Sequence, residues 1–191
     1  MKKSTLLIFD CFGVITSEIA PIWFARRYDE KTAKELKEIY FADADKGRVS
    51  IGELIDNLSK GLNIPRQTII AEWQEIFTLN SSLIELIKEL KKKYYVALLS
   101  NAPLGLVEAI IEKYDLASLF DKVFISSHYK IAKPDKEFYM LCKNAFTDAE
   151  TVYMIDDNKK NLDGLDSIGI KGHLFVSNES FIIFLQKEQL I

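Results

Sequence analysis

The chain has 191 residues, which is long enough for one α/β core and a small accessory domain. Its composition, 48% hydrophobic and 28% charged, is typical of a globular protein with a packed interior. The formal net charge of -3 disfavours nucleic acids and anionic membranes as partners, because both are bound by clusters of basic residues.

The first predicted element is a strand at residues 5–9, an apolar run that ends at Asp10. A run without alternation is typical of a strand buried on both faces of a parallel sheet. Residues 17–78 then show only helical patterns, and Ser50 with Glu53 has the spacing of a capping box. The predicted helices of this stretch cover residues 18–28, 31–41, 50–60 and 65–77.

From residue 81 onward, helical and extended patterns alternate. Ser82 and Glu85 predict a second capping box, followed by an apolar helical face that runs to Leu90. The strands after it are expected at residues 95–99, 123–126, 152–155 and 173–176. The intervening helices are expected at residues 103–114, 135–145 and 160–168, and Gly169 closes the last of them.

This order of elements predicts an α/β fold. Strands that alternate with helices form right-handed crossovers, which build a doubly wound parallel sheet with a Rossmann-like core. The core would comprise residues 1–15 and 79–191, and residues 16–78 would form an inserted α-helical cap. Because the insert directly follows the first strand, it is placed to cover the end of that strand as a lid.

Polar residues stand at the ends of the proposed strands. They are Asp10 after the first strand, Ser100 and Asn101 after the second, Lys133 in the loop after the third, and Asp156 and Asp157 after the fourth. In a parallel sheet these ends share one edge, where open α/β folds bind ligands. The sequence therefore predicts that three carboxylates, a lysine, a hydroxyl and an amide converge.

This combination of side chains favours phosphoryl chemistry. Unpaired carboxylates repel one another, and a hard divalent cation relieves the repulsion; magnesium is held by one or two carboxylates, waters and phosphate oxygens. A lysine supplies further positive charge for a phosphoryl group. Aspartate is a known nucleophile that forms aspartyl-phosphates. We therefore expect phosphoryl transfer to Asp10, followed by hydrolysis.

Four segments carry a family resemblance. Asp10-Cys-Phe-Gly-Val-Ile, Ser100-Asn101, Lys133-Pro134 and Asp156-Asp157 resemble, in this order, the four motifs of the haloacid dehalogenase (HAD) superfamily. The resemblance covers the whole chain, and the insert is similar in position to the family's helical C1-type cap. Within the superfamily, Gly47-Arg-Val-Ser50 and Asp156-Asp-Asn-Lys-Lys-Asn161 resemble the bacterial α-D-glucose-1-phosphate phosphatase group. The resemblance implies a magnesium-dependent phosphatase for a small phosphorylated substrate, with a sugar phosphate as the expected class.

The resemblance also implies roles for individual residues. Asp10 would be the nucleophile and a metal ligand, and the main-chain carbonyl of Phe12 would be a second ligand. Asp157, with Asp156 beside it, would complete the magnesium site. The phosphoryl oxygens would be bound by Ser100 and Asn101, and Lys133 would pair with both the phosphoryl group and Asp10.

The sequence departs from the family pattern at Phe12. Most phosphatases of the superfamily have a second aspartate at this position, which serves as general acid and base; phenylalanine carries no such proton. General acid–base catalysis is worth about 10²–10⁴-fold in rate, so slow turnover or a good leaving group is expected. A sugar 1-phosphate would suit. Thr16, Glu18 and His128 are the candidate replacements, by their positions in the sequence.

Phe12 also keeps two alternatives open. In 2-haloacid dehalogenases the first motif reads Asp-x-Tyr/Phe-Gly-Thr, which Asp10-Cys-Phe-Gly approaches, although Val14 replaces the threonine. Those enzymes need no metal, and the repulsive pair Asp156-Asp157 speaks against this alternative. The other alternative is a catalytically degenerate protein that binds a phosphorylated ligand or a partner.

The two cysteines, Cys11 and Cys142, exclude a disulfide framework and a zinc site, because neither belongs to a CxxC motif. Cys11 is expected to be an apolar filler, since the Cys-x5-Arg signature of cysteine phosphatases would need arginine where Ser17 stands. The apolar run before Asp10 is too short for a signal peptide, so a cytoplasmic location is expected. The sequence indicates no oligomeric state.

Overall fold

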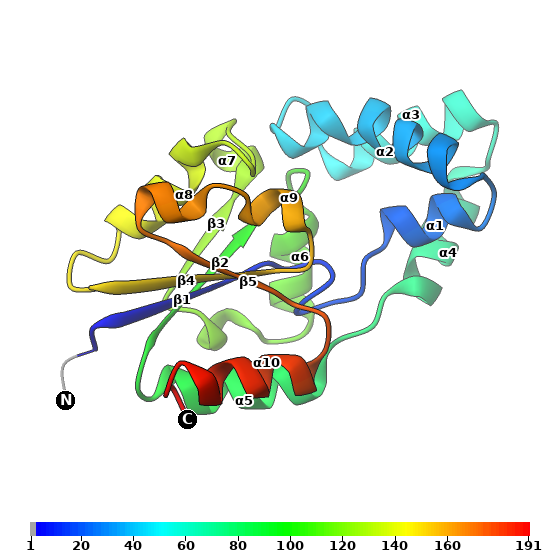
Figure 1. Cartoon of the computed structure of the whole chain (residues 1–191). Helices are drawn as coiled ribbons and strands as arrows, with labels where there is room; N and C mark the ends of the chain where they lie inside the picture. Colours follow the sequence, from blue (N-terminus) through cyan, green and yellow to red (C-terminus); the bar gives the residue numbers. More distant parts are fainter. Residues whose placement is uncertain (1–2) are drawn as a thin grey trace.

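A five-stranded parallel sheet lies at the centre of the computed structural model, which describes residues 3–191 (Figure 1). Its strands are β1 (Thr5–Phe9), β2 (Tyr95–Ser100), β3 (Lys122–Ile125), β4 (Thr151–Asp156) and β5 (Lys171–Leu174), arranged in the order β3-β2-β1-β4-β5. All neighbouring pairs are parallel. The predicted doubly wound α/β fold is thereby confirmed.

The register of the central strand β1 determines which residues lie side by side at the carboxyl edge of the sheet. Phe9 of β1 lies beside Leu98 of β2 and beside Ile155 of β4. The amide of Asp10 donates to the carbonyl of Ile155 at 2.9 Å, so the chain continues in register for one more residue. Asp10 and Asp156 therefore emerge side by side from the carboxyl edge of the sheet.

Helices cover both faces of this sheet (Figure 1). Because successive side chains of a strand point to opposite faces, Leu7 and Phe9 join one apolar cluster while Leu6 and Ile8 join another. The first cluster packs on α5 (Ser81–Lys91), α6 (Leu106–Lys113), η1 (Ala117–Leu119) and α10 (Asn178–Lys187). The second packs on α8 (Lys136–Asn144) and η2 (Leu165–Ile168), near the short helices α7 (Ser126–Tyr129) and α9 (Lys159–Leu162). Burial on both faces explains why the run at residues 5–9 does not alternate.

Between β1 and α5 the chain forms four helices that pack mainly on one another, and we call residues 20–76 the helical insert (Figure 1). They are α1 (Ala20–Ala25), α2 (Glu30–Asp45), α3 (Ile51–Leu62) and α4 (Arg66–Ile76). The insert has its own apolar cluster, in which the rings of Trp23 and Trp73 meet edge to face with centroids 6.1 Å apart. The capping box of Ser50 and Glu53 at the start of α3 is confirmed. The domain boundaries around residues 16 and 78 stay a prediction.

Several contacts fix the helical insert and its connecting segments relative to the core. At its base, the amide of Ser17 donates to the carbonyl of Thr78 at 2.9 Å, and this hydrogen bond joins the two segments that connect the insert to the core. At its far end, the amide of Ile51 donates to the carbonyl of Leu104 at 3.1 Å. A Cβ built on Gly47 would lie 2.2 Å from the carbonyl oxygen of Ser127. The insert is therefore closed over the carboxyl edge of the sheet.

Several local predictions were wrong. The helix expected at residues 160–168 is two short helices, because Gly164 between them has a left-handed φ of +75°. Helix α5 is capped by Asn80, whose side chain accepts from the amide of Leu83, and not by Ser82. The last strand lies two residues earlier than expected, and α10 was not foreseen.

Among residues 3–191, the structure contains no helix with the length and apolar character that crossing a membrane requires.

Candidate active site

A pocket of about 290 Å³ opens between the carboxyl edge of the sheet and the helical insert. Its walls from the core are Asp10, Phe12, Asn101, Pro103, Leu106, Lys133, Pro134, Asp157, Asn158, Lys160 and Asn161. Its walls from the insert and the segment that leads to it are Glu18, Ile19, Ala20, Lys37, Phe41, Asp45 and Trp73. Five of the seven predicted side-chain or main-chain positions therefore line one cavity, and the other two, Ser100 and Asp156, lie directly beneath it.

Lys133 is the positive centre of this pocket. Its ammonium Nζ lies 2.8 Å from Oδ2 of Asp10 and 2.6 Å from Oδ2 of Asp156. The lysine side chain is only 1% exposed, so water screens these two ion pairs very little. Lys133 is thus fixed between the carboxylates that end β1 and β4.

Asp156 is surrounded by donors. Its Oδ1 accepts from the amide of Asn158 at 2.8 Å, and the side-chain amide of Asn161 lies 3.0 and 3.1 Å from the two oxygens. Together with Lys133, these donors occupy both oxygens of a fully buried carboxylate. Asp156 therefore orients Lys133, and the prediction that it also contacts a metal stays a prediction.

Asp157 faces the pocket and is partly exposed. One oxygen from each of Asp10, Asp156 and Asp157 can be chosen so that all three lie within 4.8 Å of one another. Gly13, with a φ of +78°, makes room for this cluster, because a Cβ built there would lie 2.1 Å from Oδ2 of Asp157. An all-oxygen set of this size suits a hard divalent cation such as Mg²⁺.

The pKa shifts of the clustered residues also favour a bound divalent cation. Burial raises the pKa of Asp10 well above its ordinary value; Lys133 opposes this shift, and the charges of Asp156 and Asp157 strengthen it. Burial alone would lower the pKa of Lys133, but the two carboxylates it touches raise it. Burial, with the charges of Glu18 and Asp156, raises the pKa of Asp157 to about 6. Three acids thus share one ammonium, and a divalent cation would balance the remaining charge.

The two predicted phosphate-binding residues at the end of β2 differ in their contacts. Asn101 lines the pocket, but its amide group is bound to the main chain of Lys133, donating to the carbonyl at 2.9 Å and accepting from the amide at 2.8 Å. Ser100 is fully buried, and its hydroxyl has no hydrogen-bond partner among the described residues. An unmade buried hydrogen bond costs about 1–3 kcal/mol, so a polar ligand at Ser100 would recover that cost.

Phe12 lines the pocket, so the position that carries the acid–base aspartate in most of these phosphatases is apolar here. Of the three candidates, Thr16 is buried and its hydroxyl contacts main-chain carbonyls. His128 lies outside the pocket, 2.6 Å from the carboxylate of Glu108. Glu18 does line the pocket, and its carboxylate lies 3.9 Å from Lys37.

From the insert, the structure adds two charged residues that the sequence analysis missed. Lys37 and Asp45 lie on α2 and line the pocket together with Phe41. The spacing of 37, 41 and 45 places all three on one face of a helix, and this spacing was the available signal. It was overlooked because the helix was predicted to end at residue 41, four residues short of Asp45.

Comparisons with known proteins identify the family of the chain and confirm its fold. The family model described as haloacid dehalogenase-like hydrolase matches residues 5–169. A magnesium complex of a HAD family enzyme from Bacteroides thetaiotaomicron covers 97% of this chain and 100% of its own, with a TM-score of 0.76 and 20% identity. The same enzyme with magnesium and inorganic phosphate has a TM-score of 0.71 at 20% identity and covers 93% and 96%. L-2-haloacid dehalogenase from Xanthobacter autotrophicus has a TM-score of 0.64 at 16% identity and covers 98% and 84%.

One curated protein matches over a shorter stretch. Drimenol cyclase drtB from Aspergillus calidoustus is 38% identical to this chain over 69 residues. The match covers 36% of this chain and 13% of that protein. The matched stretch is therefore a small part of that protein.

Proposed function

Since the chain belongs to the haloacid dehalogenase-like hydrolase family, we propose that it is a magnesium-dependent phosphatase that hydrolyses a small phosphomonoester through an aspartyl-phosphate on Asp10. The expected substrate class is a sugar phosphate, as in the α-D-glucose-1-phosphate phosphatase group that the sequence resembles. The helical insert would be a C1-type cap.

The observation that carries this proposal is the cluster of Asp10, Asp156 and Asp157, in which Asp10 and Asp156 contact a single buried ammonium. Its excess negative charge matches a divalent cation, and its lysine matches a phosphoryl group. A structural neighbour of the same fold holds magnesium and inorganic phosphate, which supports the same ligands here.

The residues present fit a magnesium ion. Asp10, Asp157 and the main-chain carbonyl of Phe12 would hold it, with Asp156 beside them. When bound, the ion would neutralise charge on the phosphoryl oxygens and act as a Lewis acid. A raised pKa for Asp10 in the ion-free site is then no obstacle, because a bound cation favours the ionised carboxylate.

The chain's own residues prepare Asp10 for attack. Oδ1 of Asp10 accepts from the amide of Cys11 at 2.6 Å and Oδ2 contacts Lys133, so the carboxylate is held in one orientation. In-line attack on phosphorus forms the aspartyl-phosphate and releases an alcohol. Lys133 offsets the charge that develops on the phosphoryl oxygens. Water then hydrolyses the intermediate, while the closed insert keeps bulk solvent out.

The pocket itself supports a small substrate. Its volume of about 290 Å³ falls at the lower end of ordinary ligand pockets, which span roughly 300–1,000 Å³. Its wall on the insert side combines aromatic rings, Phe41 and Trp73, with the charged groups of Lys37, Asp45 and Glu18. A compact molecule with an apolar face and several hydroxyl groups, such as a sugar, matches this mixture.

A 2-haloacid dehalogenase is the second candidate. Phe12 favours it, as does the structural likeness to haloacid dehalogenases. The carboxylate cluster argues against it, because without a metal the three carboxylates of Asp10, Asp156 and Asp157 have one buried ammonium to balance them. A degenerate, ligand-binding protein is the third possibility, and it too rests on Phe12.

The deciding experiment measures phosphate release from sugar 1-phosphates, sugar 6-phosphates and 4-nitrophenyl phosphate, with and without magnesium, for the wild type and Asp10→Asn. Release that needs both magnesium and Asp10 is the expected result. No release from any of these esters would refute the phosphatase. Halide release from 2-haloacids without metal would then identify a dehalogenase, and its absence would leave a binding role.

A further inference from the structure

Asp45 lines the pocket from helix α2, on the side formed by the helical insert. Asp45 is the last residue of α2, eight residues after Lys37 and four after Phe41, and all three line the cavity. The turn that follows is fixed on the core, since Gly47 lies against Ser127. The same contact that closes the insert therefore sets Asp45 opposite the carboxyl edge of the sheet.

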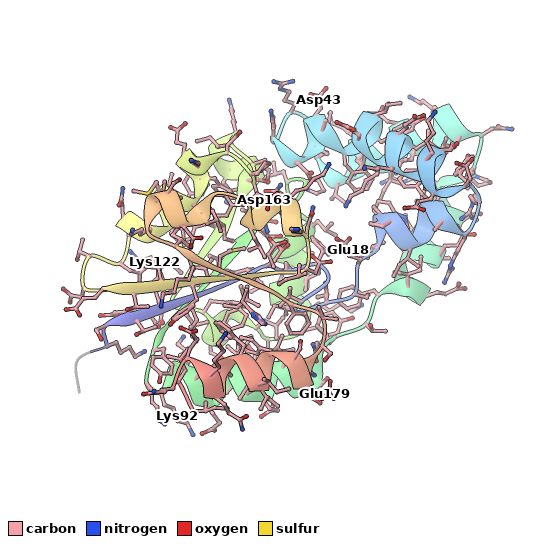
Figure 2. All side chains as sticks on the ribbon, viewed as in Figure 1. Glu18, Asp43, Lys92, Lys122, Asp163 and Glu179 are labelled. Carbon is pink, nitrogen blue, oxygen red and sulfur yellow. The ribbon has the colours of Figure 1, made fainter. Side chains whose placement is uncertain are left out.

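The carboxylate of Asp45, at the end of α2, makes no hydrogen bond or ion pair with any residue in the described range 3–191. Its neighbours on the same face and turn do have partners. Lys37 lies 3.9 Å from the carboxylate of Glu18, and Asp43 lies 2.6 Å from Arg48 on the outer surface. Figure 2 shows Asp43 on the outer side of the insert and Glu18 between the insert and the sheet. Asp45 is thus a partly buried carboxyl group with free hydrogen-bonding capacity in a ligand pocket.

Charged groups on several elements surround Asp45 and influence its pKa. Burial is the largest influence and raises its pKa to about 6; Lys37 and Lys133 oppose the shift, and Glu18 adds to it. Asp157 and Lys160 lie on the opposite wall of the pocket. On α7, which packs against α2, the titratable His128 is paired with Glu108 outside the pocket. A carboxyl group with a pKa of about 6 can both give and take a proton during a reaction cycle.

We propose that Asp45 is the general acid and base of the reaction and takes the place of the aspartate that Phe12 replaces. In the first step Asp10 attacks phosphorus, the bond from phosphorus to the leaving oxygen breaks, and the proton of Asp45 passes to that oxygen. In the second step the Asp45 carboxylate takes a proton from water. The water oxygen bonds to phosphorus, the bond between phosphorus and the Asp10 oxygen breaks, and inorganic phosphate is released with the Asp10 carboxylate regenerated. This role rests on the proposed phosphatase function.

Other residues fit this role less well. Glu18 shares the pocket, but its carboxylate lies 3.9 Å from the ammonium of Lys37 and already has a charged partner there. Phe12 carries no proton. The carboxylate of Asp157 belongs to the proposed magnesium site, where a cation keeps it ionised.

The test compares two esters that need the acid to different degrees. The first is the sugar phosphate that the wild type hydrolyses fastest, whose alkoxide leaves less readily than nitrophenolate; the second is 4-nitrophenyl phosphate, whose leaving group needs no proton. For Asp45→Asn we expect kcat/KM on the sugar phosphate to fall by about 10²–10⁴-fold. On the nitrophenyl ester kcat/KM should change less than about tenfold, because no acid is needed there. Asp43→Asn, on the same helix but outside the pocket, is the matched control and should resemble the wild type.

A second readout isolates the base. Without Asp45 the aspartyl-phosphate is hydrolysed slowly, so Asp45→Asn should release a burst of nitrophenolate equal to the enzyme concentration before slow turnover begins. In the wild type, the ratio of kcat/KM for the sugar phosphate to that for the nitrophenyl ester should fall as the pH rises above about 6. Ionisation of the phosphate group affects kcat/KM for both substrates alike, so it cancels in the ratio. The measurement uses the wild type alone and does not depend on the folding of a variant.

The outcomes separate the two proposals. A wild type without magnesium-dependent release refutes the phosphatase, whatever Asp45 does. An active wild type whose activity survives Asp45→Asn on both esters refutes the role of Asp45. Equal losses on both esters without a burst also refute it, because they indicate substrate binding or folding. A ratio of kcat/KM values that does not change with pH contradicts it independently of any substitution.

Discussion

Replacing Lys133 with methionine tests the central electrostatic claim, that one buried ammonium holds two buried carboxylates together. Its Nζ lies 2.8 Å from Asp10 and 2.6 Å from Asp156, and the side chain is 1% exposed. Methionine keeps the length and apolar contacts of the side chain but removes the charge. Asp10 and Asp156 would then lie buried without their cation.

The expected cost follows from that geometry. Removing one partner of a buried ion pair costs about 3–5 kcal/mol, because the remaining charge stays buried. For a chain of this size 1 kcal/mol corresponds to about 2–4 °C in Tm, so Lys133→Met should lower Tm by roughly 6–20 °C near pH 8. Lys88→Met is the matched control. Lys88 pairs with Glu85 on the exposed side of α5, so its loss should cost less than about 0.5 kcal/mol.

The loss should also depend on pH in a defined direction. Burial already raises the pKa of Asp10 with Lys133 in place, and the variant loses the opposing effect of the lysine. An acid with a raised pKa in the folded state destabilises the fold at high pH, and this penalty disappears as the pH falls and the acid is protonated. The difference between the variant and the wild type should therefore shrink from about pH 8 to about pH 5.

Urea unfolding without magnesium, followed by circular dichroism, measures this difference. Circular dichroism is preferable to fluorescence, because both tryptophans, Trp23 and Trp73, lie in the helical insert and report on it alone. A loss below about 1 kcal/mol near pH 8 would refute the reasoning, since it would mean that water or a rearrangement replaces the lysine. An equal loss at both pH values would refute it as well.

Three further outcomes follow from the structure. Gly13→Ala should weaken magnesium binding measured by calorimetry, because its Cβ would displace the carboxylate of Asp157, 2.1 Å away. Gly47→Ala should lower kcat/KM and increase proteolysis of the insert, because a Cβ 2.2 Å from the carbonyl of Ser127 prevents closure. Ser50→Ala should lower the unfolding free energy by about 1 kcal/mol in a denaturant titration, because it removes the capping box of α3.

Controls for these outcomes come from the same chain. Gly52→Ala is the control for both glycine variants, because a Cβ there would meet nothing closer than 3.8 Å. Unchanged magnesium affinity in Gly13→Ala would contradict the place given to Asp157. Unchanged kcat/KM in Gly47→Ala would mean that the closed insert is not needed for activity. A loss in Ser50→Ala no larger than about 0.2 kcal/mol would show that the cap hydrogen bonds are replaced by water.

The elements that sequence reasoning missed are those with weak local signals. Strands β1, β2 and β4 are buried on both faces, so their apolar runs are continuous and stand out. Strand β5 is an edge strand with three exposed residues of four, and the apolar residues at 174–176 that suggested it lie mostly beyond its end. The extended Asp163 and left-handed Gly164 split the helix expected at 160–168.

The sequence by itself determined which groups meet at the sheet edge. Parallel strands deliver their carboxyl ends to one edge whatever their loops do, so Asp10, Ser100 and Asp156 could be placed together from chain order alone. Only the tertiary structure decided how these groups pair. The position of Lys133 between two carboxylates depends on the path of the chain from β3 through α7 to α8.

The pocket wall that the helical insert contributes could not be predicted from the sequence either. Asp45 reaches the site because the helical insert docks on the core through Ile51 and Leu104, residues far apart in the chain. Helical periodicity shows which residues share a face of α2, but it does not show what that face covers. That depends on contacts between distant segments, which form only when the whole chain is folded.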